Sequence, residues 1–113
     1  MLPIHSQLIA SGRWQTLSLI EQMANIGSEV GRVRIARQRN DVDGAERAFA
    51  RALELFDFTI KDSRHQGRRK EIIRARELFC DASENGIMYN TTLEDLDRYF
   101  LAFAYAAHNN QRP

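Results

Sequence analysis

Apolar side chains recur every three to four residues in four successive segments, and this spacing constrains the fold of the chain more than any other feature. From residue 43 to 61 the apolar positions lie on one side of a helix with about 100° per residue, opposite Arg47, Arg51 and Glu54. Residues 91–108 repeat the pattern. The two stripes are Ala45, Phe49, Ala52, Leu53, Phe56, Ile60 and Leu93, Leu96, Phe100, Phe103, Ala107. The pattern predicts an all-α protein.

Capping residues indicate where these helices begin and end. Asp43 is followed by Glu46, and Thr91 by Glu94, which is the spacing of a capping box at a helix start. Gly86 is a typical helix stop. The predicted helices cover residues 13–38, 43–61, 63–85 or only 68–85, and 91–108. Since the loops are short, we expect an antiparallel four-helix bundle with a long first helix.

Length and composition are those of one globular unit. A chain of 113 residues buries about two-thirds of its surface on folding. We therefore expect a single helical-bundle domain over residues 1–113, in which 1–12, with the breakers Pro3 and Gly12, form an N-terminal arm or a helical turn. No apolar run reaches the length of a membrane span, so we expect no membrane partner.

Residues that carry catalysis or bind metals are few and scattered. His5, His65 and His108 are far apart in the sequence and Cys80 is the only cysteine, so we expect no metal site and no cofactor. Cys80 lies on an apolar stripe, where burial makes a thiol unreactive. A lone cysteine also suits a reducing compartment, which predicts a cytoplasmic location. We identify no catalytic residue and expect a non-enzymatic protein.

The first predicted helix has two apolar stripes instead of one. The first stripe is Leu17, Ile20, Ala24, Gly27, Gly31, Ile35, and the second is Leu19, Met23, Ile26, Val30, Val33. A helix at the surface of a monomeric bundle normally buries one stripe. We therefore predict that the second stripe is a dimer interface between two copies of the chain. The alternative is a long central helix that contacts the other three.

Gly27 and Gly31 lie one turn apart on the first stripe, after Ala24. Glycine inside a helix costs about 0.8–1 kcal/mol relative to alanine, so we expect a compensating close contact. This contact is either a bulky side chain of the same molecule, such as Phe56 or Phe103, or a ligand in a groove.

Arg76 is a charged residue on the otherwise apolar stripe of the third predicted helix. A buried arginine needs a carboxylate, and Glu29, Glu21 or Asp57 could supply it. Such a pair is structural, or it belongs to an anion-binding polar pocket. The candidate residues for this pocket are Glu21, Asn25, Glu29, Arg32 and Arg76.

Charge is unevenly distributed although the net charge is only +1. Residues 61–76 contain seven lysines and arginines and two acids, whereas residues 77–97 contain six acids and no lysine or arginine. The candidate nucleic-acid contacts in the basic segment are Arg64, Arg68, Arg69 and Lys70. The alternative is a solvated helix face.

Residues 14–30 and 69–77, together with 50–55 and 99–105, resemble a family of small helical proteins of prokaryotes. In outline the chain is also similar to HEPN-type and S23-type four-helix bundles. HEPN ribonucleases carry an arginine and a histidine at a fixed short spacing. Here His108 follows Arg98 by ten positions and His65 directly follows Arg64, which argues against that nuclease activity.

Together these features predict a non-enzymatic homodimer that acts through protein–protein contacts. The alternatives are a nucleic-acid-associated bundle that uses residues 61–76, and a small-anion binder that uses Arg76, Arg32 and Glu29.

Overall fold

The computed structural model describes residues 12–110, and this part of the chain is helical without a β-strand. The expectation of an all-α protein is confirmed for these residues. The predicted arm lies outside them except for Gly12. The helices are α2 (Arg13–Thr16), α3 (Leu19–Gln38), α4 (Val42–Lys61), the 3-10 helix η1 (Ser63–Arg68), α5 (Arg69–Glu84) and α6 (Leu93–Asn110).

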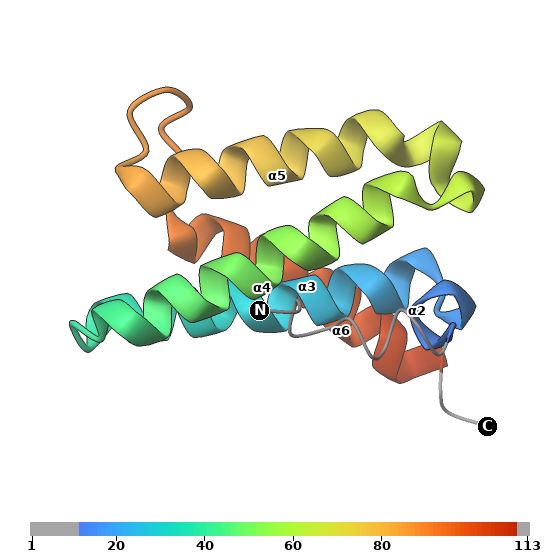
Figure 1. Ribbon diagram of the computed structural model, residues 1–113, viewed down its shortest axis with the longest axis horizontal. Coiled ribbons are helices and arrows are strands. Elements are labelled where there is room, and N and C mark those ends of the chain that lie inside the picture. Colours follow the sequence, from blue (N-terminus) through green and yellow to red (C-terminus); the bar gives the residue numbers. More distant parts are fainter. Residues whose placement is uncertain (1–11, 111–113) are drawn as a thin grey trace.

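Helix α3 is the centre of the arrangement because it packs extensively against both α4 and α6. Helix α5 lies along α4 and makes fewer contacts with α6 (Figure 1). Aromatic rings connect the helices in the core. Phe56 of α4 has its ring centroid 5.9 Å from that of Phe79 in α5 and 6.0 Å from that of Phe100 in α6. Each of these buried rings contributes about 1.5–3 kcal/mol relative to an exposed one.

The second stripe of the first long helix is part of this core, so the predicted dimer interface is wrong at these residues. Met23, Ile26, Val30 and Val33 are at most 2% exposed, and Leu19 packs against the same cluster. The physical reason is the central position of α3, since α4 and α6 of the same chain cover two of its sides. The two apolar stripes therefore reflect a central helix, although α3 packs extensively against two of the other long helices, α4 and α6, and not against all three.

The first predicted helix is divided at Leu17 and Ser18. Leu17 is extended, and the Ser18 hydroxyl accepts a hydrogen bond from the Glu21 amide at 3.1 Å. The Ser18 amide in turn donates to the Glu21 carboxylate at 3.0 Å. This reciprocal capping box satisfies amides that have no partner at a helix start, and it begins α3 at Leu19.

Two other predicted helix starts are displaced by one or two residues. Asp41, not Asp43, caps α4, because its carboxylate accepts the Gly44 amide at 2.9 Å. The capping box at α6 is formed by Thr92 and Asp95 instead of Thr91 and Glu94, with hydrogen bonds of 3.1 and 3.0 Å. In each case a neighbouring residue of the same chemical type provides the cap.

No helix within residues 12–110 has the length and apolar character needed to cross a membrane.

Candidate functional site

A groove runs along the outer side of α3 and α6, and we call it the α3–α6 groove. It consists of two adjoining hollows of about 280 and 350 Å³ that share Ala24, Ser28 and Ala104. Its floor is made of small side chains, which keep it shallow and smooth. The residues that give it this character are Ala24, Gly27, Ser28, Gly31, Ala104 and Ala107.

The two glycines allow α3 and α6 to lie close together. A Cβ atom added to Gly27 would lie 2.6 Å from the Cβ of Phe100, and one added to Gly31 would lie 3.3 Å from a carboxylate oxygen of Asp97. The expected close contact at Gly27 is therefore with a phenylalanine of the same chain, although it is Phe100 instead of Phe56 or Phe103.

Large apolar side chains border the groove and are exposed. Ile35 of α3 is 39% exposed and Leu101 of α6 is 50% exposed, and both line the hollow. Tyr105 follows Leu101 by one turn on the same face of α6 and is 64% exposed. This side of the molecule therefore presents exposed apolar surface beside the α3–α6 groove.

The two ends of the groove carry different charges. Glu21 and His108 line one end. Arg32 and the ion pair of Arg34 with Asp97, whose atoms are 2.7 Å apart, line the other.

The five residues predicted to form a polar pocket do not come together in one place. Glu29 is buried and binds two arginines, Arg32 at 2.6 Å and Arg51 of α4 at 2.9 Å. Arg76 pairs instead with Asp57 of α4 at 3.0 Å, the third of its candidate partners, and both side chains are partly exposed. The predicted anion pocket is therefore wrong as a single site, and the Arg76 pair joins α5 to α4.

Glu21 and Asn25, the other two candidates for that pocket, serve α3 itself. Glu21 belongs to the capping box, and its hydrogen bonds to Ser18 lower its pKa. The Asn25 amide donates to the backbone carbonyl of Glu21 at 2.8 Å.

The four candidate nucleic-acid contacts lie at and after η1, and three of them bind groups of their own chain. Arg64 holds the Asp62 carboxylate and donates to the Leu17 carbonyl at 2.8 Å. Arg68 pairs with Glu71 at 2.8 Å, and Arg69 donates to the Ile60 carbonyl at 3.1 Å. Lys70 is exposed. The three arginines therefore stabilise the turn between α4 and α5, and their guanidinium groups are less available to bind a phosphate.

A buried polar cluster of Gln22, Asp62 and His65 lies at this same end of the molecule. The Gln22 amide donates to the Trp14 carbonyl at 2.9 Å and to Asp62 at 3.3 Å, and its oxygen lies 3.0 Å from His65 Nε2. The hydrogen bond from Arg64 holds the pKa of the Asp62 carboxyl far below its usual range, and burial lowers the pKa of His65. Sequence reasoning missed the cluster, because its members come from α3 and from the turn after α4.

Within residues 12–110 no group of three or more His, Cys, Asp or Glu side chains is placed to hold a metal ion. Cys80 is half-buried, and this burial raises the pKa of its thiol, which makes the reactive thiolate scarcer.

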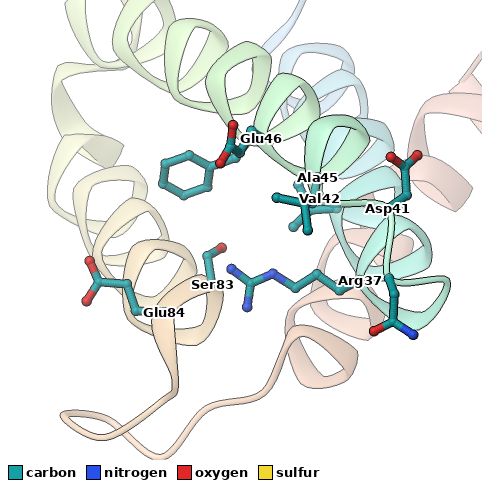
Figure 2. A pocket seen from close by; sticks show the side chains of 10 residues that line it. Arg37, Asp41, Val42, Ala45, Glu46, Ser83 and Glu84 are labelled. Atoms are coloured by element: carbon teal, nitrogen blue, oxygen red, sulfur yellow. The ribbon is translucent and has the colours of Figure 1, made fainter.

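A separate hollow lies at the opposite end of α3, where α3, α4 and the end of α5 meet, and we call it the end cavity (Figure 2). It has a volume of about 480 Å³ and is walled by Val33, Val42, Ala45 and Phe49. Arg37 and Ser83 also line it. The sequence pointed to neither residue, since they are 46 positions apart and belong to no motif.

Comparison of the chain with protein-family models, curated proteins and solved structures finds no match.

Proposed function

We propose that the protein is a non-enzymatic, antiparallel four-helix bundle of α3, α4, α5 and α6, and that it acts through protein–protein contacts. The interaction that we propose is with a second copy of the chain, through the α3–α6 groove. The observation that carries the proposal is the exposed apolar border of this groove, formed by Ile35 and Leu101, with the exposed Tyr105 one turn beyond Leu101 on α6. An apolar surface rimmed by polar residues is typical of an interaction site.

The shape of the groove supports a helix as its occupant. From Glu21 to Ile35, α3 rises by about 21 Å, which matches about four turns of a partner helix. Small side chains on the floor permit close approach of a backbone, and the partner helix gains packing contacts along its length.

Charge supports a second copy as the partner. In a twofold dimer the same surface of each copy faces the other, so each contact occurs twice. Two grooves in antiparallel orientation place the Glu21 end of one copy opposite the Arg32 end of the other. The two ends of the groove are therefore complementary in charge across such a dimer.

Sedimentation velocity at micromolar concentration tests the proposal. We expect twice the mass of one chain for the unchanged protein, and the mass of a single chain for Leu101→Glu. Ile87→Glu is the matched control, because Ile87 is 79% exposed and lies in the loop between α5 and α6, away from the groove. A folded monomer for the unchanged protein, or dissociation by Ile87→Glu as well, would overturn the proposal.

The nucleic-acid alternative has less support, since Arg64, Arg68 and Arg69 bind groups of their own chain. We propose that the similarity to HEPN-type bundles concerns the fold and not the nuclease activity. We also propose a cytoplasmic location, because the chain has a single cysteine and no disulfide partner for it.

A further inference from the structure

We propose that the end cavity binds a small amphipathic carboxylate, that is, a molecule with one carboxylate group and a short apolar chain. This inference is independent of the α3–α6 groove, since the end cavity and the groove share no lining residue. The volume of about 480 Å³ lies within the usual range of small-molecule sites.

Ser83 is the first observation that points to a ligand. Ser83 is 2% exposed, and its hydroxyl has no hydrogen-bond partner among the described residues. A buried serine in a helix ordinarily donates to the carbonyl four residues earlier, and an unpaired buried hydroxyl costs free energy. In Figure 2 the Ser83 hydroxyl points toward the guanidinium of Arg37 across the cavity. A ligand acceptor atom between the two would supply the missing partner.

Arg37 is the second observation, and it determines the sign of the ligand charge. Its side chain extends from α3 over the cavity (Figure 2). Within residues 12–110 it forms no hydrogen bond or ion pair through its side chain. A guanidinium presents a planar fork of N–H donors that matches a carboxylate. Arg37 and Ser83 together therefore offer donors to one anionic group.

Three protein carboxylates lie around the cavity, but their side chains do not occupy the space beside the Arg37 guanidinium. Asp41 accepts the Gly44 amide at 2.9 Å as the cap of α4. Figure 2 shows the carboxylates of Asp41 and Glu84 pointing away from the Arg37 guanidinium, with Glu46 at the far rim. Their negative field opposes each further negative charge, so among anionic groups it favours a singly charged carboxylate over a dianion such as phosphate.

The apolar wall determines the rest of the ligand. Val33, Ala45 and Phe49 lie beside the two donors, and Val33 and Ala45 are buried. They offer a ligand aliphatic and aromatic surface but no hydrogen bond, so the body of the molecule that occupies this space is an alkyl or aryl group.

Calorimetric titration of the full chain with octanoate tests the proposal, and octanol and octylammonium, with the same apolar chain, are matched controls. We expect saturable binding of octanoate and at least about tenfold weaker binding of both controls, the usual effect of a charge-assisted hydrogen bond. Equal binding of octanol, tighter binding of octylammonium, or no saturable binding of octanoate would each overturn the proposal.

Two variants connect the binding to the two donors. Arg37→Gln is expected to weaken octanoate binding by about tenfold or more. Arg39→Gln should leave it unchanged, since Arg39 lies just after the end of α3 and does not line the cavity. If the two variants bind octanoate equally well, the role of Arg37 is refuted.

Ser83→Ala separates a ligand contact from a structural role. Without ligand it should raise the melting temperature, by roughly 3–6 °C, because it removes an unpaired buried hydroxyl. With octanoate it should bind about fivefold more weakly than the unchanged protein. A variant that melts higher and binds octanoate as tightly as before would refute the contact.

Discussion

Gly27 and Gly31 are one turn apart on α3, and replacing each with alanine should have opposite effects on stability. Alanine gains about 0.8–1 kcal/mol over glycine in a helix interior, and this gain is the same at both positions. At Gly27 the new Cβ would lie 2.6 Å from the Cβ of Phe100, about 1 Å closer than an ordinary carbon contact. This Cβ is attached directly to the α6 backbone, so the two helices must move apart.

Overpacking of this kind costs about 1–3 kcal/mol, so Gly27→Ala should destabilise the protein by up to about 2 kcal/mol after the helix gain. At Gly31 the neighbour is a carboxylate oxygen of Asp97 at 3.3 Å, at the end of a partly exposed side chain. A small rotation relieves this contact, so Gly31→Ala should stabilise by up to about 1 kcal/mol. The difference between the variants, about 1–3 kcal/mol, measures the overpacking alone.

Urea unfolding followed by circular dichroism measures both variants against the unchanged protein. The corresponding difference in melting temperature is roughly 4 °C per kcal/mol for a chain of this size. If Gly27→Ala is as stable as Gly31→Ala, the close contact of α3 with α6 is refuted.

Three further predictions concern the polar contacts. Ser18→Ala should lower the unfolding free energy by about 1 kcal/mol, because it removes the cap of α3. Ser28→Ala, whose hydroxyl bonds only within its helix, should change this free energy by less than about 0.5 kcal/mol. Equal losses for the two variants in urea unfolding would contradict the cap. Glu29→Ala should lower the unfolding free energy by about 2–3 kcal/mol, since it leaves Arg51 partly buried without its carboxylate. Arg76→Leu should lower it by less than about 1 kcal/mol, because Arg76 and Asp57 are partly exposed. The reverse order of melting temperatures would contradict a purely structural Arg76. Acid should destabilise the protein in two steps. In the folded state the pKa of His65 lies below its ordinary value of 6.5, and the pKa of Asp62 lies below its ordinary value of 3.8. As the pH falls past each of these values, the unfolded chain binds more protons than the folded state, so the free energy of unfolding decreases. In urea unfolding over a pH series, Asp62→Asn should flatten the lower step, and an unchanged loss below about pH 4 would contradict the role of Asp62.

The helices could be predicted from the sequence because their signals are local. Apolar spacing and capping residues act within about four positions, so the segments ending at Lys61 and near Glu84 were found almost to the residue. The errors are local as well. The Ser18 box was missed because the apolar stripe continues through Leu17, and Asp41 and Thr92 took caps assigned to their neighbours.

The candidate sites were much less predictable. Ion pairs such as Glu29 with Arg51 and Arg76 with Asp57 join different helices, and for Arg76 the sequence offered three carboxylates of equal merit. Arg37 and Ser83 meet at the end cavity from α3 and α5, and neither stands out in its own helix.

The amphipathic pattern alone established that α3 would be covered on two sides, and it could not say by what. Burial of apolar surface has no direction, so a second copy of the chain and a second helix of the same chain satisfy Met23, Ile26 and Val33 equally well. Tertiary packing decided between them, because α4 and α6 of the same molecule cover these two sides. The exposed face of α3 became apparent only after α6 was in place beside it.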